Sequence, residues 1–370
     1  FLNSRERGKD IQNICLQCGT CNTVCGGKLD IAGMILKLRT KFAQEDGLNP
    51  VHKFCLDTVA DRHLFHSMLR IASVAQGMIT KGQPMIRHLP MFLSGLTAGR
   101  SLPSVAPQPF RDILPTIKQD VPNPKGKIAI FTGCLLDFVY VDIATDVVKA
   151  LNMAGYIVEM PLGQACCGAP ATYMGDVENA KKAAEMNLNA MEAEKYDYIV
   201  SACPTCTHAL RDYVDFFKDD PEMLKKAEAL RSKTFDFCKL VSMLGGLPDT
   251  GDGVPMKVTY HDSCHLNRYL GVTKEQRELL KATKGVELIE MHDCDKCCGF
   301  GGSYSVKFPE MSAPILEEKI NNIVASGADV VAVDCPGCLL QIRGGLDARG
   351  LNNIQVKHTA QIVVEKREKK

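Results

Sequence analysis

The sequence predicts an α/β fold: a pseudo-twofold tandem repeat of parallel-sheet units, preceded by a small α-helical segment. Short apolar runs of β type alternate with amphipathic helical patterns through residues 127–370, as expected for units built on parallel strands. Cysteine motifs recur within this region, 130 to 132 residues after their first appearance. A chain of 370 residues is long enough for two or three domains with a large core.

The composition is that of a soluble protein that binds metal. Hydrophobic residues make up 45% and charged residues 24% of the chain, and the net charge of +1 gives no overall field to recruit nucleic acid or an acidic membrane surface. The 17 cysteines include adjacent pairs and CxxC pairs, which favour soft-metal ligands in a reducing compartment over a disulfide-stapled secreted fold. We therefore expect a cytoplasmic protein.

The first predicted region, residues 1–100, reads as helical with a cysteine cluster near its start. Its stretch 63–96 is apolar but is interrupted by Arg70, Lys81 and Arg87, and no apolar run approaches the roughly 18 residues of a spanning helix. We expect this stretch to pack against the chain's own domains or a partner subunit. The alternative is a membrane-surface or quinone-facing element, with the protein on the cytoplasmic face of the membrane.

Residues 101–126 contain six prolines and are predicted to form an extended linker. The first repeat unit is expected at 127–250 and the second at 251–370. The segment that joins them, about 216–255, is polar and helical in pattern, and the Gly, Pro and Asp residues at its end mark the seam.

Each repeat unit contains three predicted strands, and each of the three leads into cysteine residues. In the first unit these runs are 127–134, 156–160 and 197–206, and a helical pattern covers 176–196. In the second unit the runs are 257–264, 286–291 and 329–338, and helical patterns cover 274–285 and 316–327. Because ligands of open parallel sheets bind at the carboxyl ends of the strands, the cysteines are expected to meet there.

Five cysteines per unit occur at matched spacing, with gaps of 31, 0, 35 and 2 residues in the first unit and 32, 0, 36 and 2 in the second. Five thiolates exceed the four ligands of a zinc site or of a cubane cluster, whereas adjacent cysteines can bind different irons of an extended cluster. Structural zinc is the weaker alternative. The candidate metal ligands are Cys134, Cys166, Cys167, Cys203 and Cys206, then Cys264, Cys297, Cys298, Cys335 and Cys338.

The N-terminal motif "CLQCGTCNTVC" supplies Cys15, Cys18, Cys21 and Cys25 at the spacing of bacterial ferredoxins, which predicts a cubane [4Fe–4S] cluster. In two-cluster ferredoxins the fourth cysteine binds the other cluster, yet no partner motif is present in this sequence. Three explanations stay open: a partner motif upstream, which would add a second cubane, Cys55 as a ligand, or closure of all four thiols on one cluster. We favour the first, because the sequence begins with Phe rather than Met.

A few further residues are candidates for supporting roles. Cys294 is expected either to ligate or tune a cluster or to be an ordinary buried thiol, and the latter is favoured. His261 and His292 are candidates for a role next to the ligands or in proton transfer, although satisfied core histidines are the preferred interpretation. No glycine-rich dinucleotide motif is present, so the sequence shows no sign of a flavin or nicotinamide site of its own.

The repeated cysteine pattern resembles the CCG domain, the cysteine-rich module of heterodisulfide reductase subunits B and D. The stretches "GQACCGAPA" and "VTYHDSCHLNRYLG" are similar to the iron–sulfur proteins of lactate utilisation and of L-lactate dehydrogenase complexes, and this resemblance extends over 127–368. The resemblance implies two noncubane [4Fe–4S] clusters, each on five cysteines, next to the ferredoxin-type cubane.

Two functions follow from the resemblance. In the first, the chain is an electron-transfer subunit that takes electrons from an FAD-containing flavoprotein, with lactate as the foremost substrate, and passes them to a quinone-linked or soluble acceptor. In the second, the chain is the catalytic subunit of a heterodisulfide or disulfide reductase, and the two noncubane clusters cleave a disulfide between the repeat units. The first is the preferred hypothesis.

Overall fold

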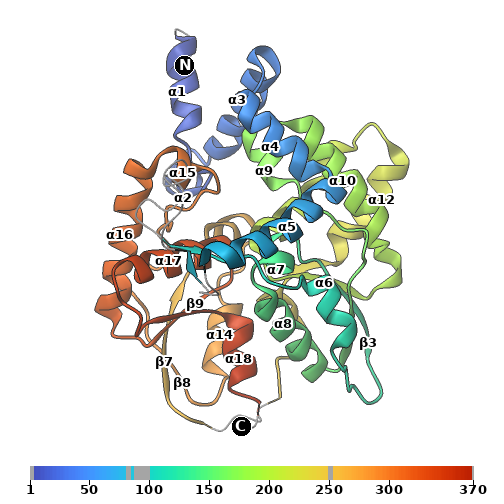
Figure 1. Ribbon diagram of the computed structural model, residues 1–370, viewed down its shortest axis with the longest axis vertical. Coiled ribbons are helices and arrows are strands. Elements are labelled where there is room, and N and C mark those ends of the chain that lie inside the picture. Colours follow the sequence, from blue (N-terminus) through green and yellow to red (C-terminus); the bar gives the residue numbers. More distant parts are fainter. Residues whose placement is uncertain (1–3, 81–84, 87–100, 249–252, 369–370) are drawn as a thin grey trace.

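The computed structural model describes residues 4–80, 85–86, 101–248 and 253–368 (Figure 1). Two four-stranded parallel sheets with flanking helices form the body, and a helical segment precedes them. The predicted fold class, an α/β tandem repeat after a helical segment, is confirmed. Within the described residues no helix is both long enough and apolar enough to cross a membrane.

The first sheet has the order β4-β3-β5-β6, and all its strands are parallel. Its central strand is apolar and fully buried at Ile128, Ala129 and Ile130, which is why helices cover both faces. Its strands are β3 (Gly126–Ile130), β4 (Tyr156–Glu159), β5 (Tyr198–Ser201) and β6 (Thr234–Asp236). Its helices are α7 (Leu135–Phe138), α8 (Val141–Met153), α9 (Ala169–Met174), α10 (Val177–Met191), α11 (Pro204–Asp212), α12 (Pro221–Lys233) and α13 (Phe237–Met243).

The second sheet, β10-β9-β7-β8, repeats this order of strands, so the two units share one topology. Its strands are β7 (Met256–His261), β8 (Val286–Leu288), β9 (Val330–Val333) and β10 (Gln355–His358). Its helices are α14 (Glu275–Lys281), α15 (Tyr304–Lys307), α16 (Pro309–Ser326), α17 (Pro336–Ala348) and α18 (Thr359–Glu365), and a π-helical turn, η5, spans His265–Tyr269.

One hydrophobic cluster spans both units, and each unit has a further cluster of its own. Helix α8 of the first unit packs against α18 of the second, and Gln361 Nε2 donates to Asp142 Oδ2 at 2.8 Å across this contact. Buried side chains of both units, such as Leu151 and Val363, belong to the same apolar cluster. Each unit therefore completes the core of the other.

The N-terminal helices begin at the end of the molecule opposite the C-terminus, and the last of them, α5, runs across its middle (Figure 1). They are α1 (Arg5–Asn13), α2 (Thr20–Val24), α3 (Ile31–Asp46), α4 (Pro50–Ala60) and α5 (Arg62–Thr80). Helix α3 packs on α9 and α4 packs on α10 of the first unit. The Arg39 side chain strengthens this contact, because it donates hydrogen bonds to the backbone carbonyls of Gln12, Cys15 and Tyr173.

Helix α5 covers the first part of the apolar stretch 63–96, and one of its faces packs against the chain itself. Ser73 Oγ donates to the Ala106 carbonyl at 2.8 Å, and Arg70 pairs with Asp112 at 2.7 Å. This packing agrees with the preferred prediction. Residues 81–84 and 87–100 of the apolar region lie outside the described residues.

The prediction of an extended linker at 101–126 is wrong for its middle. Phe110–Ile113 form the short helix α6, followed by a 3₁₀ turn at Leu114–Thr116. Phe110 is fully buried and Leu114 nearly so, because one helical turn places both side chains on the core. The joining segment also contains β6, which the sequence did not predict, and residues 249–252 of the predicted seam lie outside the described residues.

Candidate metal centre

The predicted ligands of both units line one cavity of about 800 Å³, which lies between the units and the N-terminal helices. The sheet topology brings the cysteines of each unit together, because the loops that carry them follow the carboxyl ends of parallel strands. The predicted ligands that line it are Cys134, Cys166, Cys167, Cys203, Cys206, Cys264, Cys297, Cys298, Cys335 and Cys338, and Cys15 of the N-terminal motif lines it as well. The structure therefore brings the two predicted sets into one site, although their role as ligands stays a prediction.

In each unit a CxxC pair begins a helix. Cys203 is the N-cap of α11 and Cys335 the N-cap of α17, and proline follows each at the first helical position, where its missing N–H costs nothing. The third residue after each N-cap, Cys206 or Cys338, lies in the first turn, so the two sulfurs of a pair face the same side. A CxxC pair at a helix start is thus held by backbone geometry alone.

The adjacent cysteines of the first unit lie on a loop that is fixed from two helices. Asn187 of α10 accepts a hydrogen bond from the Ala165 N–H at 2.8 Å and donates to the Cys166 carbonyl at 2.9 Å. The Tyr213 hydroxyl donates to the Cys167 carbonyl at 2.9 Å. Both polar side chains are buried, so they orient the loop without competing for the thiols.

The thiols of the first set form a continuous series of contacts. Hydrogen bonds join Cys134 to Cys166, Cys166 to Cys167, Cys167 to Cys206, and Cys206 to Cys203. The hydrogen bond with Cys166, followed by burial, raises the pKa of Cys134 well above its ordinary value. The thiols of Cys166 and Cys206 donate to Cys167 and lower its pKa to about 6.

The second set repeats this arrangement. Cys264 contacts Cys297, Cys297 contacts Cys298, and Cys298 contacts Cys338, which in turn contacts Cys335. The neighbouring thiol of Cys297 lowers the pKa of Cys298 well below its ordinary value, whereas the hydrogen bond with Cys298 raises that of Cys338. So many buried sulfurs cannot all ionise unless a cation binds among them, and the donor set therefore fits a soft metal or an iron–sulfur cluster.

Two contacts connect the three predicted sets. Cys203 of the first set makes a thiol hydrogen bond to Cys335 of the second. Cys18 of the N-terminal motif makes one to Cys297, and this contact, with burial, raises the pKa of Cys18. The sulfurs thus form an unbroken path from the N-terminal motif through the second set to the first.

The N-terminal motif surrounds the short helix α2. Burial raises the pKa of Cys21, and the charges of Cys15 and Cys18 raise it further, which places these three sulfurs near one another. Cys25 ends α2, at its C-cap. Cys55 is exposed on α4.

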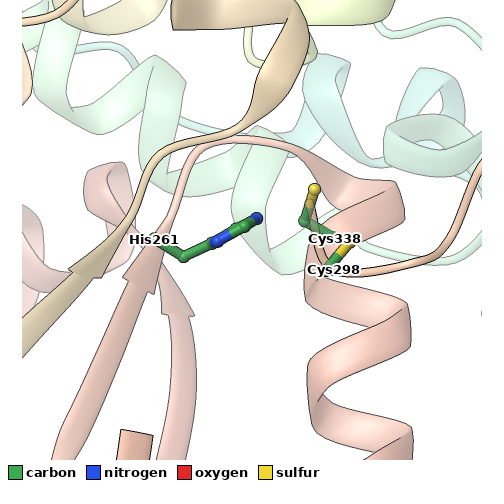
Figure 2. A group of neighbouring side chains, drawn as sticks. All are labelled: His261, Cys298 and Cys338. Atoms are coloured by element: carbon green, nitrogen blue, oxygen red, sulfur yellow. The ribbon is translucent and has the colours of Figure 1, made fainter. Parts of the chain in front are cut away.

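The three residues predicted as candidates for supporting roles, Cys294, His292 and His261, lie in different surroundings. Cys294 is absent from the cavity lining and lies 3.6 Å from Arg277 Nη2, and burial raises its pKa to about 11. His292 is 79% exposed and pairs with Asp293, so a role next to the ligands is wrong for it. His261 is buried and its ring faces the thiols of Cys298 and Cys338 (Figure 2), so it is not the satisfied core histidine that was preferred.

Sequence reasoning missed a polar group at the cavity wall. The Tyr173 hydroxyl lies 2.7 Å from His265 Nε2 and 3.4 Å from His208 Nδ1, and the rings of His265 and Tyr269 stack at 4.9 Å. This group joins α9 and α11 of the first unit to η5 of the second. No sequence motif marks Tyr173, because its partners come from distant parts of the chain.

Comparison with known proteins agrees with this architecture. The family model for the cysteine-rich domain CCG matches residues 128–211 and 258–343. Lactate utilization protein A of Shouchella clausii is 39% identical over 240 residues, which is 65% of this chain and 99% of that protein. The probable glycolate oxidase iron-sulfur subunit of Bacillus subtilis is 31% identical over 375 residues, which is 97% of this chain and 84% of that protein.

The fold and the paired cysteine sets define an iron–sulfur oxidoreductase subunit built on tandem cysteine-rich domains. The chain belongs to the family that includes lactate utilization protein A and the glycolate oxidase iron-sulfur subunit. The coarse functional prediction, an oxidoreductase subunit with iron–sulfur clusters, is confirmed by this membership.

Proposed function

We propose that this chain carries electrons from an FAD-containing partner subunit, which oxidises a 2-hydroxy acid, to a quinone-linked or soluble acceptor. Lactate is the proposed substrate of the partner, because the relatives include lactate utilization protein A, and glycolate is the next candidate. The clusters in this proposal are a ferredoxin-type cubane on the N-terminal motif and two noncubane [4Fe–4S] clusters on the two sets of five cysteines. The proposed location is the cytoplasm or the cytoplasmic face of the membrane.

One observation supports relay more than any other: the unbroken series of sulfur contacts. Cys18 contacts Cys297 at one end of the second set, and Cys335 contacts Cys203 at the other end. Electron carriers bound to these thiols would be close neighbours. Two-electron oxidation of a hydroxy acid by a flavin delivers electrons that iron–sulfur clusters accept one at a time, so a series of clusters suits this task.

The chain's own residues would hold the clusters and keep water away. Seven of the ten predicted ligands, all but Cys134, Cys264 and Cys297, are buried at the cavity wall. Gly299 N–H donates to Cys297 Sγ at 3.4 Å, the kind of backbone hydrogen bond that tunes a cluster. Exclusion of water and fixed N–H dipoles set the potential of a bound cluster.

The test is anaerobic purification of the intact complex, followed by counts of iron and acid-labile sulfide and by EPR spectroscopy. We expect about 12 iron atoms and as many sulfides per chain, four for each of three clusters, together with bound flavin and lactate-dependent reduction of a dye. Zinc in place of iron, or the absence of labile sulfide, would overturn the proposal. Flavin and dye reduction with glycolate alone would overturn lactate as the substrate.

A second candidate, disulfide reduction, is favoured by the cavity itself. Both cysteine sets line the same 800 Å³ space and meet where Cys203 contacts Cys335, so one small molecule could reach both clusters. The reaction would consume two electrons and two protons, break the S–S bond and release two thiols. Turnover of a disulfide by the isolated chain with a reduced dye, without lactate or flavin, would favour this function over relay.

A further inference from the structure

The two units differ at one position that faces the cysteine sets. Each first strand leads to a cysteine ligand candidate, and the residue three positions before that cysteine is buried in both units. In the first unit this residue is Phe131, before Cys134, and in the second it is His261, before Cys264. An apolar ring in one unit thus corresponds to an imidazole in the other.

Both rings lie among cysteines of their own unit. Phe131 is fully buried and belongs to the apolar cluster that contains Cys166, Cys167, Cys203 and Cys206 of its own unit. A phenyl ring satisfies such a position by packing alone. An imidazole at the equivalent position carries two nitrogen atoms, each of which requires a partner when buried.

His261 ends strand β7 and is 1% exposed. A ring nitrogen of His261 and the sulfurs of Cys298 and Cys338 all lie within 4.8 Å of one another, and the ring points toward the two sulfurs (Figure 2). Three side-chain donors at this separation can share one metal ion. Among the described residues, this is the group of histidine, cysteine and acidic side chains whose possible ligand atoms all lie within 4.8 Å of one another.

Neither nitrogen of His261 makes a hydrogen bond of normal geometry within the described part of the chain, although the backbone carbonyl of Cys294 faces the ring. A buried polar atom without a partner costs about 1–3 kcal/mol. Histidines that bind metal characteristically present the second ring nitrogen to a backbone carbonyl or carboxylate. The Cys294 carbonyl near the ring and the two thiols within 4.8 Å of a ring nitrogen match that arrangement.

We propose that His261 is a nitrogen ligand to an iron of the second cluster, next to Cys298 and Cys338. The proposal rests on the proposed function, since it assumes an iron–sulfur cluster on the second set. Imidazole would bind iron through a neutral nitrogen, a donor that the five thiolates do not supply. The first cluster, with Phe131 at the equivalent position, lacks such a nitrogen ligand, so strong nitrogen hyperfine coupling is expected at the second cluster alone.

The test uses the intact protein labelled with ¹⁵N-histidine and reduced until the second cluster is paramagnetic. Pulsed EPR is expected to detect a strong ¹⁵N hyperfine coupling from a directly bound imidazole. His261→Phe copies the residue of the first unit and therefore suits the fold, and it is expected to abolish the coupling. His261→Asn, which keeps a polar side chain, is expected to abolish the coupling as well and guards against misfolding of the first variant.

His292→Phe is the matched control, because His292 is 79% exposed, and this variant is expected to leave the coupling unchanged. A coupling that persists in both His261 variants, or only the weak coupling of a hydrogen-bonded nitrogen in the unsubstituted protein, would overturn the inference. Full counts of iron and sulfide without strong nitrogen coupling would leave the proposed function standing and remove only the histidine ligand. Missing iron and sulfide would remove both.

Discussion

The buried ion pair of Arg111 and Asp137 offers a quantitative test of how the first cysteine set is supported. Asp137 lies in α7, three residues after Cys134, and is fully buried, and the Arg111 side chain is 9% exposed. The carboxylate accepts the Arg111 backbone N–H at 3.0 Å and its Nε–H at 2.7 Å, with a further contact from Nη2. The pair thus ties α6 to the helix that begins at Cys134.

We expect Arg111→Met to lower the free energy of unfolding by about 3–5 kcal/mol, because removal of one partner leaves a buried charge without compensation. Burial raises the pKa of Asp137 and Arg111 opposes that rise, so the substitution raises the pKa further. The folded state then binds a proton more tightly than the unfolded state does. The loss of stability is therefore full at neutral pH and shrinks as the pH falls toward the unfolded pKa of Asp, near 3.9.

The assay is urea unfolding of the anaerobic protein, followed by circular dichroism at several pH values. The double variant Arg111→Met with Asp137→Asn is the control, since the neutral amide oxygen still accepts the backbone N–H of residue 111. It is expected to recover most of the loss. A loss below about 1 kcal/mol, which is ordinary for an exposed pair, or a double variant as unstable as the single one, would refute the reasoning.

Three further predictions concern the sites. Gly133→Ala is expected to lower the iron content, because Gly133 has φ +57° and an added Cβ would lie 3.0 Å from Cys206 Sγ. Gly350→Ala is the control, because Gly350 also has a positive φ, +70°, but faces open space, and it is expected to retain iron. Equal iron content in the two variants would contradict this prediction. Cys203→Ser is expected to lose the EPR signal of the first cluster, whereas Cys238→Ser is expected to keep it, because Cys238 does not line the cavity. Loss of the signal in Cys238→Ser but not in Cys203→Ser would contradict the proposed ligands of the first cluster. Arg39→Met is expected to weaken the EPR signal of the cubane cluster and to expose residues 5–46 to protease, because three backbone carbonyls lose their hydrogen-bond donor. Lys41→Met, on the same helix, is the control and is expected to cause neither change.

Much of the body was predictable because the chain repeats itself. Apolar runs such as the one at 127–134 predicted β3, and its counterpart at 257–264 predicted β7. Strands β6 and β10 were not predicted, since Thr234–Asp236 and Gln355–His358 are short and mix polar with apolar side chains. Such edge strands form because the central strand provides a partner, and local pattern alone carries little of that information.

The cysteine residues of the site were also predictable, because their spacing repeats in the two units. Spacing located every thiol that lines the cavity, because strand ends of a parallel sheet converge. Spacing could not distinguish His261 from His292, since the difference lies in burial and in which direction each ring points. Tyr173 was beyond reach for a similar reason: its contacts with His208 and His265 bring together residues from both units.

The duplication within one chain has a consequence for how such a protein can change over time. Two identical subunits related by a twofold axis would carry every substitution twice, so both metal sites would have to alter together. Here the halves are separate stretches of one polypeptide, and histidine stands in one half where phenylalanine stands in the other. In a fused chain each half can change alone, so a scaffold with twofold pseudo-symmetry can hold two metal sites with different neighbours.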